Sequence, residues 1–191
     1  GLAEALAGLE GPLAVLDFES VSPAIPVWNG CHPYDPVPAQ FSCHFQDGGQ
    51  WRSEHWIAEG AGDPRPELVR RVARRCEAAR TILAYHADYE RYCLYLISEA
   101  LPELKETIEG ILARLVDALP LVRDYVYHPG FGGSFGLKSV LPALVPKLGY
   151  GGMEIADGMV ASAELRRLLL ADGMPDAERA RVREGLGRYC E

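Results

Sequence analysis

Two carboxylates one residue apart, Asp17 and Glu19, are the residues of this chain best suited to chemistry. They end the apolar run 13–20, which predicts a buried strand. Side chains alternate faces along a strand, so the two acids point the same way and Phe18 points the other way. Like charges at the end of a buried strand are costly unless cations bind there, and oxygen ligands suit Mg²⁺ or Mn²⁺. The alternative is a strand that runs out into an acidic, solvated turn.

Length and composition indicate one domain over residues 1–191. No apolar stretch approaches the roughly 20 residues needed to span a bilayer, and no signal-peptide pattern opens the chain, so we expect no membrane partner. The five cysteines show no C-x-x-C spacing, which favours free thiols in a reducing cytoplasm. Because the sequence starts and stops abruptly, we expect it to be a fragment of a longer protein.

The formal net charge of −8 argues against a broad electropositive surface for nucleic acid. A local contact is still compatible with this charge, because metal ions bound in an acidic site supply the positive charge that meets a phosphate. Nucleic acid therefore stays open as a partner where the acids gather cations.

Hydrophobic periodicity and turn residues predict an α/β arrangement with a mixed sheet. Asp47, Gly48 and Gly49 form a hairpin signal between two strands, so the first three strands are expected to form a meander. Acids stand at the carboxyl ends of the first and last strands and at the start of the helix after the fourth, where open α/β sheets place their sites. We expect strands over 13–20, 40–45, 50–57, 81–85 and 115–117, and helices over 66–79, 86–100, 102–114, 134–141, 157–170 and 176–189.

The order of these elements and acids resembles the DEDD 3′–5′ exonucleases of the RNase H-like superfamily. Their first motif is a strand ending in D-x-E, matched by Asp17 and Glu19. Their second is a helix start of the form N-x-x-F-D. The segment from His86 to Glu90 occupies that place, with histidine for asparagine and glutamate for aspartate. Glu90 is one methylene longer than aspartate and remains a suitable metal ligand, while Asp88 is a competing candidate that a helix would turn elsewhere.

The third motif of the tyrosine branch, Y-x-x-x-D on a C-terminal helix, resembles the end of this chain. Tyr189, Cys190 and Glu191 match its first three residues, and the resemblance places the aspartate two residues past Glu191. The H-x-x-x-x-D motif of the histidine branch is not matched, because Gly133 stands five residues after the last histidine, His128. Since hard cations are held mainly by charged oxygens, we expect the 191-residue chain by itself to be nearly inactive.

A second set of residues, spread over nearly the whole chain, carries a narrower resemblance. It comprises Pro33, Tyr34, Gln40, Phe41, Ser42, Tyr85, Glu90, Asp117, Gly133, Ser134, Lys138, Val140, Leu141 and Pro142. The set resembles an uncharacterised bacterial family predicted to be RNase H-like nucleases, in which a glutamate in the second motif is normal. This implies a single RNase H-like domain with a mixed sheet, a three-strand antiparallel meander plus two further strands, flanked by helices. Members often carry it at the C-terminal end of a longer protein, so an additional N-terminal domain is expected.

The resemblance implies that Asp17, Glu19, Glu90 and the fourth carboxylate hold two Mg²⁺ or Mn²⁺ ions roughly 3.5–4 Å apart. One ion lowers the pKa of a water that attacks phosphorus in line, and the other stabilises the leaving 3′-oxygen. Tyr189 is expected to orient that water, since the ordinary pKa of tyrosine near 10 makes proton abstraction the less suitable role. The alternative for Tyr189 is an aromatic side chain that packs a helix end.

Candidate substrate contacts surround these acids: Phe18, Trp28, Tyr34, His86, Asp117 and Lys138. Trp28 and Tyr34 are placed to stack on an unpaired base, or to pack over the sheet edge. Asp117 is either an outer partner of the metal ligands or a cap for the next segment, and we favour the cap. Lys138 follows Ser134, the expected N-cap of its helix, and either neutralises a substrate phosphate or is a solvated lysine.

These expectations favour a metal-dependent 3′–5′ exonuclease that acts on single-stranded nucleic acid or on a frayed 3′ end. Glu90, His86 and the acidic net charge also fit a nuclease-like binding or regulatory module that has lost catalysis. A third hypothesis is a small-molecule metal phosphoesterase with the same acid cluster.

Overall fold

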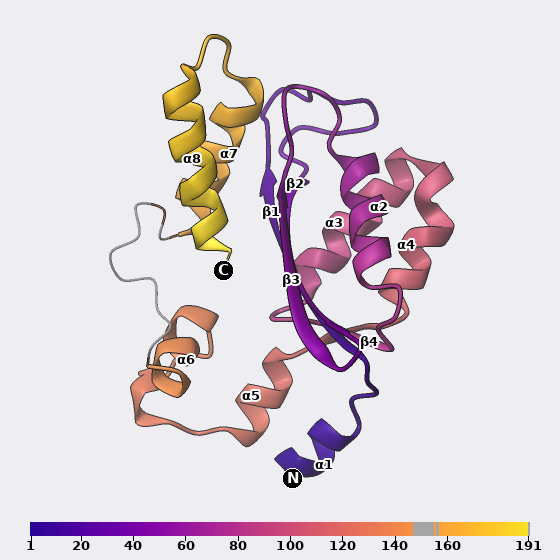
Figure 1. Ribbon diagram of the computed structural model, residues 1–191, viewed down its shortest axis with the longest axis vertical. Helices are drawn as coiled ribbons and strands as arrows, with labels where there is room; N and C mark the ends of the chain where they lie inside the picture. Colours follow the sequence, from indigo (N-terminus) through magenta and orange to yellow (C-terminus); the bar gives the residue numbers. More distant parts are fainter. Residues whose placement is uncertain (147–154, 156, 191) are drawn as a thin grey trace.

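Five strands form one mixed sheet at the centre of the computed structural model, which describes residues 1–146, 155 and 157–190 (Figure 1). The strands are β1 (Leu13–Val21), β2 (Val37–Asp47), β3 (Gln50–Ile57), β4 (Thr81–Ala84) and β5 (Leu115–Asp117). Their order across the sheet is β3-β2-β1-β4-β5, so β1 is the central strand. β1 pairs antiparallel with β2 and parallel with β4, and β4 pairs parallel with β5. The expected α/β class with a mixed sheet is confirmed.

The first three strands form the expected antiparallel meander. The two-residue turn Gly48-Gly49 joins β2 to β3, and both glycines have positive φ angles, 57° and 81°, which glycine adopts without strain. β2 begins earlier than expected, at Val37, because Val37 pairs with Val21 past a bulge that follows Glu19. The bulge bends the end of β1 next to the two acids.

Helices cover both faces of the sheet, with α2, α3 and α4 on one face and α7 and α8 on the other (Figure 1). Within the described ranges, no helix combines the length and the apolar character needed to cross a membrane. The helices are α1 (Leu2–Ala7), α2 (Arg65–Arg75), α3 (Asp88–Ala100), α4 (Lys105–Leu112), α5 (Leu119–Tyr125), α6 (Leu137–Leu144), α7 (Gly158–Leu170) and α8 (Asp176–Tyr189), with single 3₁₀ turns at Pro102–Leu104 and Pro129–Phe131.

Local contacts explain where the helices depart from their expected bounds. α6 begins at Leu137 rather than at residue 134, because the Ser134 hydroxyl accepts a hydrogen bond from the Gly136 amide in a turn that precedes the helix. Ser134 is therefore not the N-cap. The short helix α5 was not expected. It begins directly after Asp117, whose carboxylate accepts a hydrogen bond from the Leu119 amide.

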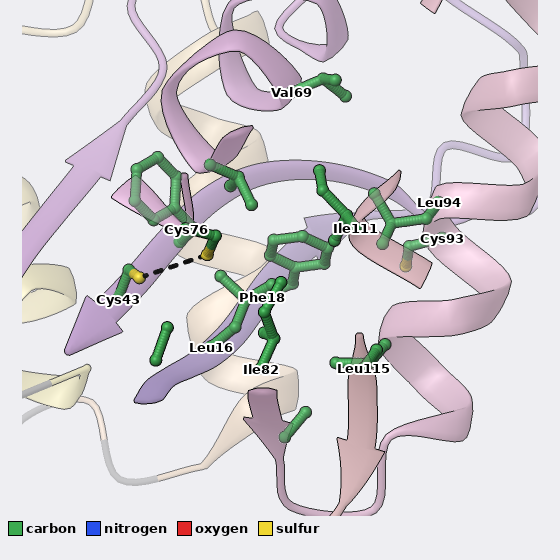
Figure 2. Close-up of a cluster of buried hydrophobic side chains, with 14 of the residues drawn as sticks. Leu16, Phe18, Cys43, Val69, Cys76, Ile82, Cys93, Leu94, Ile111 and Leu115 are labelled. Atoms are coloured by element: carbon green, nitrogen blue, oxygen red, sulfur yellow. Dashed lines mark hydrogen bonds between the residues drawn. The ribbon is translucent and has the colours of Figure 1, made fainter. Parts of the chain in front are cut away.

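One hydrophobic core lies between the sheet and helices α2, α3 and α4 (Figure 2). Leu16 and Phe18 of β1 are fully or nearly fully buried in it, together with Cys43 of β2 and Cys76 at the end of α2, whose sulfur atoms lie 3.9 Å apart. The strand alternation thus turns Phe18 away from the acids and into this core. The expectation that Phe18 contacts substrate is wrong.

A second core lies between the other face of the sheet and helices α7 and α8. Leu165 of α7 and Leu186 of α8 are fully buried there, against Val21 of β1. Trp28 is also buried in this core, and its indole N–H donates to the Ala61 carbonyl at 3.0 Å. Because its ring is covered, Trp28 does not offer a face to an unpaired base, and the alternative of packing over the sheet is confirmed.

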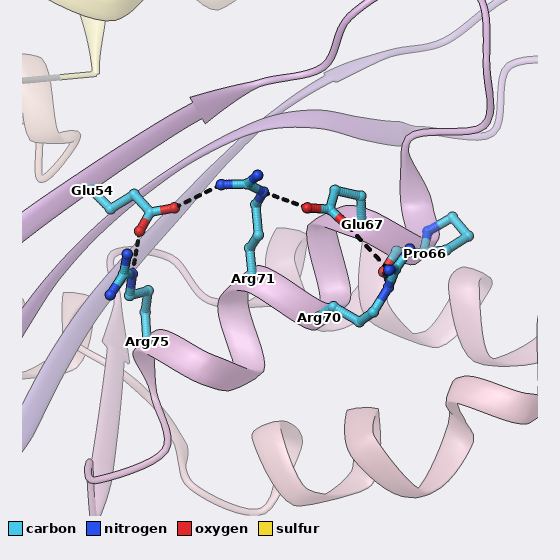
Figure 3. Close-up of polar contacts among 6 residues, drawn as sticks. All are labelled: Glu54, Pro66, Glu67, Arg70, Arg71 and Arg75. Atoms are coloured by element: carbon cyan, nitrogen blue, oxygen red, sulfur yellow. Dashed lines mark hydrogen bonds and ion pairs between the residues drawn. The ribbon is translucent and has the colours of Figure 1, made fainter.

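Ion pairs join α2 to the edge strand β3 (Figure 3). Glu54 of β3 accepts from Arg71, at 3.2 Å, and from Arg75, and Arg71 also bonds Glu67 at 2.7 Å. Two of the arginines in this helix therefore face the sheet rather than the solvent. The pairs are partly exposed, so each contributes little by itself and together they fix the angle of α2 on the sheet.

We predict that Leu16→Ala lowers the free energy of unfolding by about 2–5 kcal/mol, because it leaves a cavity among close-packed neighbours. Val15→Ala is the matched control. Val15 precedes Leu16 on β1, points to the opposite face and is 38% exposed, so its truncation should cost less than about 1 kcal/mol. Urea unfolding of the two variants makes the comparison. Equal losses would contradict the assignment of the two faces.

Candidate functional site

A pocket of about 650 Å³ opens where β1 and β4 end. Asp17 and Glu19 of β1 both line it, as the strand alternation predicts. The remaining wall comes from four parts of the chain that lie far apart in sequence: Tyr85 and His86, Leu119, the segment 134–139, and Tyr189. The structure therefore brings the two acids of β1 and the C-terminal Tyr189 to one cavity.

The two acids face the pocket because β1 extends beyond its parallel neighbour. The pairing of β1 with β4 ends at Val15, which lies opposite Leu83, whereas the pairing with β2 continues past Asp17 and Glu19. The β4 edge of β1 is thus unpaired at the acids. The chain that leaves β4 turns away there, and this leaves room for a ligand at the carboxyl end of the strand.

A strained turn carries the chain from β4 into α3. His86 has a φ angle of +66°, in the left-handed region where histidine is one of the few enriched side chains other than glycine. Its amide donates to the Asp117 carboxylate at 2.8 Å, and the Leu119 amide donates to the same carboxylate at 2.9 Å. Asp117 therefore caps two backbone segments, as favoured from the sequence, and it does not line the pocket, whereas His86 does.

Glu90 lies in the first turn of α3 and is buried, with only 3% of its surface exposed. It does not line the pocket, but it is electrostatically coupled to it: the charge of Asp17 raises the pKa of Glu90, and the charge of Glu90 raises the pKa of Glu19. A hydrogen bond shared by the Tyr89 and Ser20 hydroxyls holds this turn against β1. Within the part of the chain that the structure describes, the Glu90 Oε2 atom has no hydrogen-bond partner.

The pKa of all three acids is raised, by loss of hydration in each case and also by neighbouring negative charge at Glu19 and Glu90. The surrounding protein limits the hydration of the Asp17 carboxylate and raises its pKa to about 6, although the side chain is exposed to solvent. Burial, with the Asp17 and Glu90 charges, raises the pKa of Glu19 to about 8 against the opposing effect of the Lys138 ammonium. Burial raises the pKa of Glu90 to about 7. These three carboxyls therefore hold their protons to higher pH than ordinary carboxyls do.

The described residues do not form a ready-made metal site. Over residues 1–146, 155 and 157–190, no three His, Cys, Asp or Glu side chains are grouped so that they could hold one metal ion. Asp88, the competing candidate on α3, is exposed and does not line the pocket. The first-turn acid that is coupled to Asp17 is Glu90.

Lys138 and Tyr189 lie together on the pocket wall. The Lys138 ammonium lies 5.7 Å from the centre of the Tyr189 ring, a cation–π distance. Tyr189 is the last residue of α8 and is half-buried, and Lys138 is exposed within the pocket wall. Burial and the charges of Asp17 and Glu19 raise the pKa of the adjacent Cys190 thiol, so the end of α8 lies close to both acids.

Two features of the pocket differ from the sequence expectations. Tyr34 is 69% exposed but does not line the pocket, so the structure does not bring it to the acids. The Tyr85 hydroxyl, by contrast, donates to the Phe135 carbonyl at 2.5 Å and ties the loop before α6 to the end of β4.

The raised pKa values predict a pH dependence of stability. The three carboxyls bind protons more tightly in the folded than in the unfolded chain, so the free energy of unfolding should fall as pH rises from about 4 to about 8. Glu19→Gln removes the largest single contribution. Its thermal midpoint should match the wild type near pH 4 and exceed it near pH 8 by about 2–4 °C, the equivalent of about 1 kcal/mol.

Glu99→Gln, the same change at an exposed position of α3, is the control and should shift neither midpoint. A Glu19→Gln midpoint that follows the wild type at both pH values would show that this carboxyl is not crowded.

The sequence profile described as "Domain of unknown function (DUF2779)" matches residues 14–136. The matched region includes Asp17, Glu19, His86 and Glu90, and it ends before Lys138 and Tyr189. None of the curated proteins compared with the chain matches it. Since the match covers more than half of the sequence, the chain belongs to the family of the Domain of unknown function (DUF2779).

Proposed function

We propose that this chain is a metal-dependent 3′–5′ exonuclease domain acting on single-stranded or frayed nucleic acid. One observation carries the proposal: Asp17 and Glu19 lie side by side in a 650 Å³ pocket, coupled to the buried Glu90, with Lys138 and Tyr189 on the same wall. An acid group next to a cation and a phenol matches the demands of phosphodiester hydrolysis. The family description assigns no activity, so the proposal depends on this site.

The donor chemistry of the acids fits Mg²⁺ or Mn²⁺. All three side chains offer carboxylate oxygens, and the buried Glu90 Oε2 has no hydrogen-bond partner among the residues that the structure describes. Three acids with raised pKa values form an uncompensated group that a divalent cation would neutralise. When bound by Asp17, Glu19 and Glu90, two such ions would supply an activated water and stabilise the charge on a leaving 3′-oxygen.

Other residues of the pocket would bind the substrate, orient the attacking water and limit solvent access. The Lys138 ammonium, on the pocket wall, would meet a substrate phosphate and hold it near the acids. The Tyr189 hydroxyl would orient the attacking water, because the high ordinary pKa of a phenol makes it a donor and acceptor rather than a base at neutral pH. Tyr85 and His86 close the side of the pocket where β4 ends, and they would limit access by bulk water.

The fold is compatible with this proposal. An antiparallel three-strand meander extended by two parallel strands is the sheet implied by the resemblance to RNase H-like exonucleases. The acids of the first two motifs lie on β1 beyond its pairing with β4 and in the first turn of α3, an arrangement compatible with the resemblance.

One observation favours a second candidate, a nuclease-like nucleic-acid-binding module without catalysis. The described residues contain no ready-made group of three metal ligands, and the buried Glu90 does not reach the pocket surface. Such a module would bind an oligonucleotide without degrading it. The same assay separates the two candidates.

We predict that Asp17→Asn lowers Mn²⁺-dependent degradation of a labelled single-stranded oligonucleotide more than about 100-fold, beyond the usual effect of an outer-shell change. Its thermal midpoint without metal should stay unchanged or rise, because one crowded charge is gone. The assay uses the natural protein at its full length, because the resemblance places a fourth carboxylate outside these 191 residues.

Asp88→Asn, the same substitution at an exposed residue of α3, is the control and should degrade at the wild-type rate. Wild-type degradation by Asp17→Asn would show that Asp17 is not a metal ligand. Tight oligonucleotide binding without cleavage by the wild type would support the binding module, and preferred hydrolysis of simple phosphoesters would indicate a small-molecule phosphoesterase.

A further inference from the structure

Gln40 of β2 is a fully buried polar side chain next to the site but not part of its surface. It pairs directly with Glu19 across the β1–β2 ladder, so both side chains lie on the face of the sheet covered by α7 and α8. It is 0% exposed and does not line the pocket. Gln40 therefore cannot touch a substrate, and its amide must act on the protein itself.

The amide nitrogen of Gln40 binds the last turn of α8 on both sides of Tyr189. Its Nε2 atom donates to the Leu186 carbonyl at 2.8 Å and lies 2.8 Å from the Cys190 sulfur. The Cys190 amide donates to the Gly187 carbonyl, one position short of continuing the helical pattern. The Leu186 carbonyl would otherwise be an orphan acceptor at the helix end, and Gln40 satisfies it.

The same turn is packed tightly against the sheet. Gly187 faces β3 so closely that a Cβ atom there would lie 3.4 Å from the His55 ring nitrogen. Contacts from β2 and from β3 thus hold the turn from one side, while the Lys138 ammonium lies over the Tyr189 ring from the α6 side. Tyr189 is held between them.

The carbonyl oxygen of the Gln40 amide shows that burying this side chain lowers the stability of the fold. Gln40 Oε1 is buried and has no hydrogen-bond partner among the described residues, a situation that destabilises the folded chain. An apolar side chain at residue 40 would avoid that cost but could not donate to Leu186. Gln40 therefore serves to position the end of α8 rather than to stabilise the fold.

We propose that Gln40 is a positioning residue: it fixes the last turn of α8 so that Tyr189 faces Asp17 and Glu19. The anchoring stands on the hydrogen bonds, and the consequence for hydrolysis rests on the proposed function. Gln40 connects the strand that flanks the acids to the helix that carries the phenol, so the sheet and the C-terminal helix move as one unit at the pocket.

The first arm of the test needs no activity. Gln40→Leu in the 191-residue chain should speed amide hydrogen exchange in the last turn of α8 at least several-fold, without changing exchange in the first two turns. Gln46→Leu is the matched control. Gln46 is a glutamine on the same strand whose side chain accepts from the Leu13 amide, far from α8. Unchanged exchange in the Gln40→Leu variant would overturn the anchor.

The second arm measures hydrolysis of the labelled oligonucleotide with Mn²⁺, again in the natural protein at its full length. Gln40→Leu should lower kcat about 10- to 100-fold with KM changed less than about twofold, as expected of a misplaced group. In a Tyr189→Phe background the same substitution should cost almost nothing more, because Gln40 acts through Tyr189.

Equal losses with and without the tyrosine hydroxyl would overturn the positioning role. A wild-type chain without nuclease activity would contradict the proposed function alone, and the exchange arm would still decide whether Gln40 fixes the Tyr189 turn.

Discussion

The alternation of side chains along β1 is the constraint on which the rest of the structure depends. β1 is the central strand, and each of its residues is committed to one of two faces. Leu16 and Phe18 fill the core under α2, α3 and α4, and this leaves Asp17 and Glu19 on the other face. A shift of register by one residue would bury both acids in an apolar core, so the packing of the sheet fixes the site.

The fold accommodates Asp17 and Glu19 because β1 extends beyond the end of its pairing with β4. Where the parallel pairing stops, the chain turns sharply at His86, with its amide held by Asp117, and starts α3 so that Glu90 comes close to Asp17. The resulting pKa values near neutrality show that the protein brings negative charge together at a cost in stability. Natural proteins concentrate such costs at functional sites, which is the physical reason for treating this pocket as one.

Much of the scaffold follows from local patterns. The apolar run of β1, the Asp47-Gly48-Gly49 hairpin and the acid-ended strand β5 lie where periodicity and turn residues predict them. The D-x-E alternation also places Asp17 and Glu19 together correctly. These predictions succeed because each depends on a handful of neighbouring residues.

Other features depend on contacts between distant parts of the chain and have no local signal. Trp28 looks like an exposed loop aromatic, yet it is buried in the second core, and α5 begins at a cap from Asp117 that only the folded turn creates. Gln40 lies 146 residues before its partner Leu186, so nothing near it in the sequence indicates the contact. The approach of the Lys138 side chain on α6 to the Tyr189 ring on α8 likewise appears only in the folded pocket.

A crystal of the protein soaked with Mn²⁺ and a nucleoside monophosphate tests the central claim most directly, because the anomalous signal of Mn²⁺ locates the metal without reference to activity. We predict a metal peak against Asp17 and Glu19, with the phosphate on the side of the pocket that carries Lys138 and Tyr189. Absence of any metal peak at the two acids, or a metal and phosphate bound together elsewhere on the protein, would contradict the assignment of this pocket as a nuclease site.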